Sequence, residues 1–200
     1  MGKLNDAFYQ RKDVVQVAKD LLGKHLCTHI GGKLTTGKIV ETEAYKAPED
    51  MGSHAYNYRK TSRTLPFYKA GGIAYVYLIY GTYHLFNVIT GTAQTPHAVL
   101  VRGVEPVSGL NTMLRRRNMR EIAYKLTAGP GLLSMALGIT TNHNETDLQG
   151  NTIWIEEHNE TVGKDDRVQS PRVGMNIPEP WKSMPWRFRI KNNPWASPAK

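Results

Sequence analysis

Residues 75–87 read Tyr75-Val-Tyr-Leu-Ile-Tyr-Gly-Thr-Tyr-His-Leu-Phe-Asn87. Both ends of this stretch are rich in β-branched and aromatic residues, which favour strands, and Gly81-Thr82 between them is typical of a tight turn. The pattern predicts a β-hairpin whose strands cover residues 73–80 and 83–89. Because side chains alternate along a strand, Tyr75 and Tyr77 share one face, while Tyr80 lies next to the exposed tip.

Strand and helix signals continue on both sides of this hairpin. Further strands are predicted at residues 25–30, 33–45, 98–105, 152–156 and 187–190, with Gly31-Gly32 joining the first two and Pro106 ending the third. Helices are predicted at residues 13–25, 108–118 and 129–136, with Asp13 as a cap and Pro130 in a first turn. Residues 47–72 show no periodicity, which indicates an ordered loop or binding segment.

The length and the order of these elements predict the fold class. The 200 residues suffice for one domain that buries about 70% of its unfolded surface. Strands gather before residue 105 and helices are dispersed. We therefore expect a mixed α/β (α+β) fold, with one domain over residues 1–200, a curved and mainly antiparallel sheet, surrounding helices and a protruding hairpin. Residues 192–200 contain two prolines and little to pack, which predicts a frayed tail.

Positive charge and tyrosine concentrate in one part of the chain. Residues 51–104 contain no Asp or Glu and hold seven of the ten tyrosines. Between residues 51 and 120, nine basic residues face Glu105 as the single acid, so this part carries +8 of the total charge of +9. The nine are Arg59, Lys60, Arg63, Lys69, Arg102, Arg115, Arg116, Arg117 and Arg120. Such a concentration of positive charge favours binding to a polyanion. The alternative interpretation is an ordinary basic surface in contact with solvent.

Cysteine content and hydropathy indicate the compartment. Cys27 is the single cysteine, which excludes an internal disulfide and is compatible with a reducing environment. No apolar run approaches the roughly 20 residues of a membrane span, and no signal peptide is recognisable. We therefore expect a cytoplasmic protein without a membrane partner.

The predicted strand at residues 33–45 carries the first candidate for catalysis. Alternation places Ile39, Glu41, Glu43 and Tyr45 on one face, so that a carboxylate lies beside an aromatic ring. A carboxylate there can orient and deprotonate a water molecule. The alternative for this strand is that it faces solvent and that its glutamates lie on the surface. The alternative for the hairpin is that its tyrosines pack in a core.

Three other groups of residues are candidates for a function. His25-x-Cys27-x-His29 places three possible metal ligands on one strand face, but no fourth ligand has suitable spacing, so we expect no metal and no cofactor. Lys46 is the amine nearest to Glu43 in sequence, yet alternation turns it away, which argues against lyase chemistry. Arg115, Arg116 and Arg117 form either a solvated face or a contact to nucleic acid.

Five segments of the chain resemble the alkyladenine (3-methyladenine) DNA glycosylase family, and they do so in order over residues 17–156. The segments are Ile39-Val-Glu-Thr-Glu-Ala-Tyr45; Ala47-Pro-Glu-Asp50 with His54; Tyr75-Val-Tyr-Leu-Ile-Tyr-Gly81 with Asn87; Val99-Leu-Val-Arg-Gly-Val-Glu-Pro106; and Leu126-Thr-Ala-Gly-Pro-Gly131. The resemblance implies a monofunctional, monomeric enzyme of bacterial type that acts on double-stranded DNA. The implied substrates are damaged purines (3-methyladenine, 7-methylguanine, hypoxanthine and ethenoadenine), and the implied product is an abasic site.

The resemblance also implies a role for each matching residue. Glu43 is implied as the general base and Arg102 as the group that holds Glu43, the water and a phosphate. Tyr45 and Tyr77 are implied to sandwich the flipped base, beside His54 as a hydrogen-bonding group and Asn87 at the pocket floor. Tyr80 is implied to wedge into the DNA, and Arg59 and Arg63 to contact its backbone.

Two departures from the family pattern and one rival function bear on these expectations. The aromatic loop around Tyr56 and Tyr58, and His84 after the wedge position, leave the preference among lesions open. The rival is a non-catalytic module that binds RNA or single-stranded nucleic acid and uses its tyrosines for stacking. That function explains the charge and the aromatic residues but gives Glu43 no task.

Overall fold

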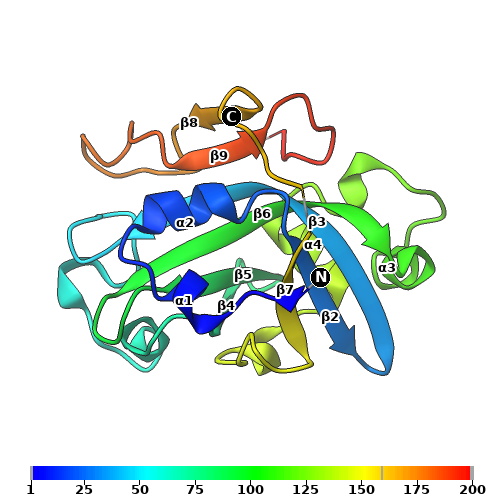
Figure 1. Ribbon diagram of the computed structural model, residues 1–200, viewed down its shortest axis with the longest axis horizontal. Coiled ribbons are helices and arrows are strands. Elements are labelled where there is room, and N and C mark those ends of the chain that lie inside the picture. The colour runs from blue at the N-terminus through cyan, green and yellow to red at the C-terminus, as the bar shows by residue number, and fades with distance from the viewer. Residues whose placement is uncertain (1, 159, 199–200) are drawn as a thin grey trace.

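The computed structural model describes residues 2–158 and 160–198. Its centre is a curled antiparallel sheet (Figure 1) in the order β1 (Gly2–Lys3), β7 (Ile153–Glu157), β2 (His25–Ile30), β3 (Lys33–Lys46), β6 (His97–Ser108), β5 (Tyr83–Thr90) and β4 (Ala74–Ile79). Two more strands extend it, because β9 (Arg187–Ile190) pairs with β3 and β8 (Arg167–Ser170) pairs with β9. The predicted mixed α/β fold with a curved antiparallel sheet is confirmed.

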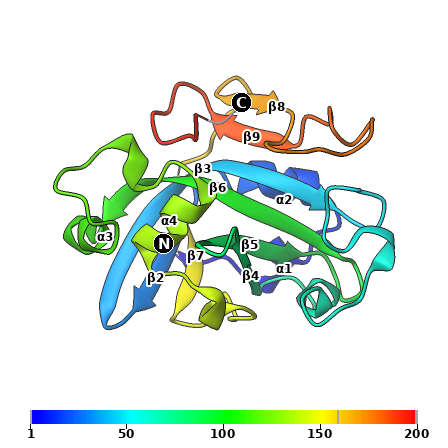
Figure 2. The ribbon, with the colours of Figure 1, turned by 180° about the vertical axis from the view of Figure 1, so that it is seen from behind.

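Short helices cover both faces of this sheet. They are α1 (Asp6–Tyr9), α2 (Val14–Asp20), α3 (Leu110–Arg116) and α4 (Pro130–Leu137), with 3-10 turns at Tyr56–Tyr58, Leu65–Tyr68, Tyr124–Leu126 and Thr141–His143. In Figure 1, α1 and α2 lie in front of the sheet, and in Figure 2, seen from behind, α4 lies in front. The pair β8–β9 runs along one edge of the molecule in both views.

Several predicted boundaries need correction. Asp13 caps α2 by accepting hydrogen bonds from the next residues, but the helix ends at Asp20 instead of residue 25, before the left-handed Gly23 (φ 84°). Strand β6 continues through Pro106 to Ser108. This half of β6 pairs with β3 on one side only, so Pro106 can lack its N–H without breaking a hydrogen bond to a strand on the other side. Ser108 is therefore not a helix start. The elements α1, β1 and β8 were not predicted.

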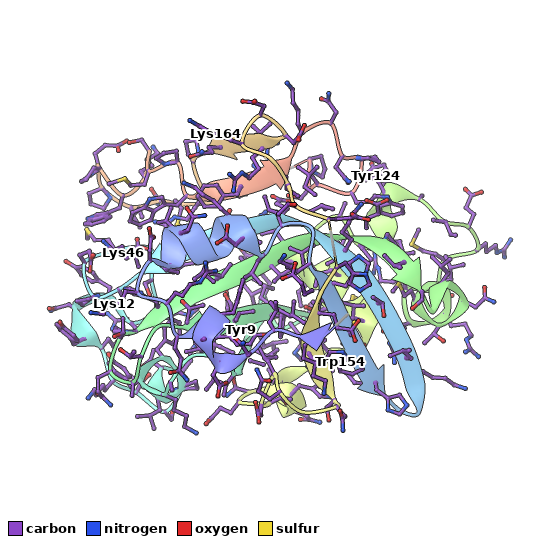
Figure 3. All side chains as sticks on the ribbon, in the orientation of Figure 1. Tyr9, Lys12, Lys46, Tyr124, Trp154 and Lys164 are labelled. Atoms are coloured by element: carbon purple, nitrogen blue, oxygen red, sulfur yellow. The ribbon has the colours of Figure 1, made fainter. Side chains whose placement is uncertain are left out.

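Two hydrophobic clusters hold the layers together. The larger one joins α2, α4 and the sheet, and it includes the fully buried ring of Tyr9 (Figure 3). The smaller one packs the 47–72 segment against the sheet through Ala47, Ala55, Phe67, Tyr68, Tyr75, Ile89 and Ala98. The second cluster explains why a segment without periodicity is ordered, as was predicted.

The end of the chain is not the frayed tail that composition suggests, as far as residue 198. Trp195 packs against the main core, and Ser197 is only 5% exposed. Residues 199–200 lie outside the described part of the chain. Among the residues that are described, no helix has the length and apolar character required to cross a membrane.

Candidate active site

Two β-bulges lie side by side where β3 pairs with β6. Ile39 pairs with Val104 and Glu41 with Gly103, which leaves Val40 as an extra residue in β3. Thr42 then pairs with Val101, which leaves Arg102 as the extra residue in β6. Bulges bend a strand and change the direction of a side chain. The first puts Ile39 in the main core, contrary to the predicted alternation, and the second directs Arg102 toward the glutamates of β3.

Glu43 is fully buried and is surrounded by hydrogen-bond donors. Its Oε1 accepts from the backbone N–H of Val173 (2.8 Å) and lies 3.3 Å from Arg102 Nη1, and its Oε2 accepts from the hydroxyl of Tyr45 (2.9 Å). These three donors suit an anionic carboxylate. Burial, followed by the charge of Glu43, raises the pKa of Tyr45 well above its ordinary value, so this hydroxyl stays protonated and donates. The interpretation of Glu43 as a surface glutamate is therefore wrong.

Arg102 is buried between two carboxylates. Its Nε donates to Glu41 Oε1 at 2.9 Å, while Nη1 faces Glu43. Burial alone would lower the pKa of Arg102, but the charges of Glu43 and Glu41 raise it. Glu41 shares the face of Glu43, as alternation predicts, and is likewise fully buried.

The tyrosines of β4 form an aromatic wall with the 47–72 segment. The rings of Tyr75 and Tyr77 stack at 5.4 Å between centroids, and the ring of His54 meets Tyr77 edge-on at 4.8 Å. His54 Nδ1 lies 2.9 Å from the Tyr75 hydroxyl, which also accepts from Arg63 Nε at 3.2 Å. Arg63 lies over the Tyr77 ring at 4.8 Å. The sequence-predicted residues His54, Arg63 and Tyr77 are thus in mutual contact.

Electrostatics in this wall favour neutral side chains. Burial, together with the positive charges of Arg63 and Arg59, lowers the pKa of His54 to about 4. Burial raises the pKa of Tyr77 to about 12. Both groups are therefore uncharged near neutral pH and can act as an aromatic surface with polar edges.

A cavity of about 400 Å³ opens between this wall, the hairpin and the start of α4. It is lined by Tyr45, Tyr77, Ile79, Tyr80, Tyr83, Leu85, Leu100, Arg102, Gly129, Pro130, Gly131, Leu132, Val173, Gly174 and Met175. Its volume is in the range of roughly 300–1,000 Å³ that is usual for small-molecule sites. Three of the lining residues, Tyr45, Arg102 and Val173, are those that contact Glu43. The carboxylate therefore lies directly behind one wall of the cavity.

Tyr80 stands at the tip of the β4–β5 hairpin and is 88% exposed. The turn is closed by the Thr82 N–H, which donates to the Ile79 carbonyl at 3.2 Å. Tyr80 and Gly81 both have positive φ (52° and 67°), a conformation that costs about 1 kcal/mol for a residue with a side chain. A large aromatic ring in this strained, solvent-exposed position is unusual for a structural residue and points to a binding role.

Asn87 is placed in the sheet directly beside the site. It pairs with Tyr75 on one side and with Leu100 on the other, and Leu100 in turn pairs with Glu43. The Asn87 amide nitrogen donates to the carbonyls of Tyr75 (3.1 Å) and Leu85 (3.3 Å). These bonds fix the orientation of the amide, but Asn87 itself is not among the residues that line the cavity, whereas its neighbours Leu85 and Leu100 are.

An ion pair that was not predicted joins two loops of the site. Arg172 and Asp50 form two hydrogen bonds (2.6 and 2.8 Å), and both side chains are fully buried. Arg172 also lies over the ring of Tyr45 at 4.6 Å and directly precedes Val173, the donor to Glu43. The pair therefore connects the segment that carries His54 to the loop that closes over Glu43.

Other candidates lie apart from this cavity or have structural contacts. The Arg59 side chain is exposed, and Lys46 (Figure 3) pairs with Glu49 at 3.1 Å. Arg116 donates to the carbonyls of Ile30 and Ala136, and Arg117 to that of Leu126, so these two residues tie α3 to its neighbours, whereas Arg115 is exposed. His84 accepts from the Thr141 N–H, and Tyr56 and Tyr58 are exposed.

The three possible metal ligands of β2 are dispersed. His25 stacks on His158 at 3.6 Å, the buried Cys27 accepts from Thr36 Oγ1, and His29 is exposed. Within residues 2–158 and 160–198, no three His, Cys, Asp or Glu side chains gather in a way that could hold a metal ion.

Sequence reasoning missed the residues that reach Glu41 and Glu43 from the last third of the chain. Val173 donates to Glu43, and Arg187 and Ser197 donate to Glu41, while Arg172 reaches the Ala44 carbonyl and Asp50 beside them. Val173 acts through its backbone, so its residue type carried no signal. The alternation that placed Glu41 beside Glu43 was the one available hint, since two adjacent buried carboxylates require cations that the strand itself does not supply.

Comparisons with known proteins agree with one another. The chain matches the sequence model of the methylpurine-DNA glycosylase (MPG) family over residues 7–194. A "Putative 3-methyladenine DNA glycosylase" of Chlamydia felis (strain Fe/C-56) is 45% identical over 190 residues, 94% of this chain and 95% of the relative. Identically named proteins of Clostridium tetani (strain Massachusetts / E88) and Bacillus cereus (strain G9842) are each 44% identical, covering 98% and 96% of this chain and 98% and 97% of theirs.

Proposed function

The chain belongs to the methylpurine-DNA glycosylase family, and we propose that it is a DNA-3-methyladenine glycosylase that hydrolyses the N-glycosidic bond of damaged purines in double-stranded DNA. The observation that carries this proposal is the position of Glu43. A fully buried carboxylate with three donors lies behind the wall of an aromatic cavity that opens beside an exposed tyrosine. The protein acts as a monomer in the cytoplasm, without a cofactor.

Base flipping provides the access that this reaction needs. The sugar bond of a stacked base is out of reach, so the damaged nucleotide leaves the duplex and its base enters the cavity. Tyr45 and Tyr77 line that cavity and stack on the base, with His54 at the edge of Tyr77. Tyr80, at the tip of the hairpin, fills the space left in the duplex, and the cost of unstacking is offset by contacts to the bent DNA.

In the chemical step, Glu43 accepts a proton from a water molecule whose oxygen forms a bond to the sugar C1′. The N-glycosidic bond breaks, and its electron pair leaves with the base. A purine methylated at N3 or N7 carries a positive charge, which this electron pair neutralises, so such a base leaves without an added proton. The same charge attracts the faces of Tyr45 and Tyr77. Arg102 positions Glu43 and the water molecule relative to each other, and it also faces a neighbouring phosphate of the DNA.

Contacts at the rim and floor set affinity and selectivity. Arg59 and Arg63 attract the DNA backbone, and their affinity depends on salt because phosphate contacts release counterions. The amide of Asn87, whose orientation is fixed, discriminates against normal guanine at the exocyclic amine of that base. We propose 3-methyladenine, 7-methylguanine, hypoxanthine and ethenoadenine as substrates; the last two are neutral, so the purine takes up a proton from solvent as it leaves.

The proposal is tested by the Glu43→Gln variant on a duplex with one hypoxanthine or 3-methyladenine. Base release should fall at least about 100-fold, because general-base catalysis contributes on that order, while binding to the lesion duplex persists. The matched control is Glu49→Gln, which changes a half-exposed carboxylate of the neighbouring loop and should leave the rate unchanged. Near-normal turnover by Glu43→Gln would place the base elsewhere.

Two further results distinguish this function from its rivals. Tight binding of the wild type with no base release would favour a module for RNA or single strands. Trapping of a covalent protein–DNA adduct by borohydride would contradict a monofunctional reaction. We expect no adduct, because the strand persists to Lys46 and its amine pairs with Glu49.

A further inference from the structure

Glu41 is the centre of a buried network to which the end of the chain contributes. Its Oε1 accepts from Arg187 Nε (2.6 Å), Arg102 Nε (2.9 Å) and Ser197 Oγ (2.9 Å), and its Oε2 accepts from the Ser197 N–H (2.5 Å). Glu41 is fully buried, and its partners are almost so. A carboxylate in this environment requires such donors, because burial of an unpaired charge is strongly unfavourable.

The network determines the direction in which Arg102 points. Each nitrogen of its guanidinium has a different neighbour: Nε donates to Glu41, Nη2 donates to Ser197 Oγ at 3.4 Å, and Nη1 lies 3.3 Å from Glu43 Oε1. A guanidinium is planar, so fixing two of its nitrogens fixes the third. Ser197 thus touches both Arg102 and the carboxylate that competes with Glu43 for it.

Among the described residues, two carboxylates and two guanidinium groups make up this network. Glu41 and Glu43 carry two negative charges, and Arg102 and Arg187 carry two positive charges. Because Ser197 and Arg187 supply three of the four bonds that the described residues make to Glu41, Arg102 can turn one nitrogen toward Glu43. Without the serine hydroxyl, Glu41 has one donor fewer and draws Arg102 away from Glu43.

The segment 193–197 is built to deliver Ser197 to this place. Asn193 Nδ2 donates to Glu105 Oε2 (3.0 Å), and its Oδ1 accepts from the Trp195 N–H (2.9 Å), which forms a turn at the edge of β6. A Cβ atom on Gly103 would lie 2.6 Å from the Trp195 carbonyl oxygen. The glycine next to Arg102 therefore permits the tail to pack against the strand.

We propose that this C-terminal segment is part of the catalytic apparatus, with Ser197 as a positioning residue that holds Arg102 against Glu43. The inference rests on the proposed glycosylase function. Ser197 touches neither substrate nor reacting atoms, and it acts through Glu41 and Arg102. Its loss affects the rate of base release and leaves DNA binding unchanged.

The test compares Ser197→Ala with Ser197→Thr, which retains the hydroxyl, and with the control Ser134→Ala, which removes another buried serine hydroxyl from α4. Single-turnover base release is measured with excess protein, and affinity is measured on a duplex with an uncleavable abasic analogue. We expect Ser197→Ala to react about 10-fold more slowly, the effect of losing one hydrogen bond to a charged group, with wild-type affinity. Ser197→Thr should recover most of the rate, and Ser134→Ala should match the wild type.

Every outcome decides the matter. A wild-type rate for Ser197→Ala, or a parallel loss of rate and affinity that threonine does not restore, overturns the inference. Thermal unfolding is followed for each variant, and if Ser197→Ala does not fold, Ser197→Cys replaces it, with a weak donor of similar size that should give an intermediate rate. If the wild type itself releases no base, the proposed function fails and the inference fails with it. If the wild type releases the base but Ser197→Ala does not behave as expected, the proposed function stands and the inference about Ser197 is wrong.

Discussion

The Asp50–Arg172 ion pair makes the Asp50→Asn substitution a sharp test of how the site is held together. Asp50 Oδ2 accepts from Arg172 Nη1 (2.6 Å) and the Lys46 N–H (3.1 Å), and its Oδ1 accepts from Arg172 Nη2 (2.8 Å) and the Gly52 N–H (2.8 Å). Asparagine has nearly the same size but no charge. Its NH₂ group would face two donors whichever way the amide turns.

The expected loss follows from the burial of both partners. Removing one side of a buried ion pair costs about 3–5 kcal/mol, because the other charge remains in a medium of low dielectric. Arg172 retains the carbonyls of Ala44 and Trp181 and lies over the rings of Tyr45 (4.6 Å) and Trp186 (5.2 Å). We therefore expect the lower end, about 3 kcal/mol, which is a large part of the roughly 5–15 kcal/mol typical of a domain.

Urea unfolding followed by tryptophan fluorescence measures this loss. The matched control is Glu49→Gln, since Glu49 pairs with Lys46 but both side chains are 43% exposed, and such pairs contribute at most about 1 kcal/mol. The double variant Asp50→Asn/Arg172→Met should lose less than the sum of its single changes, because it leaves no buried charge unpaired.

A loss below about 1 kcal/mol for Asp50→Asn, or one equal to that of the control, would refute the view that this pair is a buried structural clamp. If the view is right, base release should slow as well. Arg172 precedes Val173, so a displaced arginine also moves the N–H that donates to Glu43.

Three further predictions concern single side chains. Tyr80→Ala should leave stability unchanged, since the ring is 88% exposed, but should weaken binding to lesion duplex by about 1–3 kcal/mol, as titration with labelled DNA would show. In the folded protein the pKa of His54 is lowered to about 4, from the ordinary value of 6.5. As the pH falls below 6.5, His54 therefore becomes protonated in the unfolded chain before it does so in the folded protein. The wild type should therefore lose about 2 kcal/mol more stability than His54→Gln by roughly pH 5, and equal pH dependence of the two would contradict this. Burial raises the pKa of the Cys27 thiol to about 12, so iodoacetamide at mildly alkaline pH should modify it only after denaturation.

Local sequence patterns specify much of this protein. Alternation along one strand placed Glu43 beside Tyr45, alternation along another placed Tyr75 beside Tyr77, and turn chemistry located the hairpin with Tyr80 at its tip. These features depend on residues within a few positions of one another, and a strand displays its side chains in the same order wherever it packs. The fold class, most strands and the aromatic half of the candidate site were therefore predictable.

The state of the carboxylates depends on partners that are distant in sequence. Alternation was also compatible with Glu41 and Glu43 facing solvent, and it gave the wrong face for Ile39. The two glutamates are buried because β9, the Val173 loop and the C-terminal segment cover β3, and these segments are more than a hundred residues away in sequence. The bulge that directs Arg102 inward also contributes. Such bulges and coverings arise from the pairing of whole strands, so only the tertiary structure decides that these two glutamates are buried and that one of them lies behind a cavity wall.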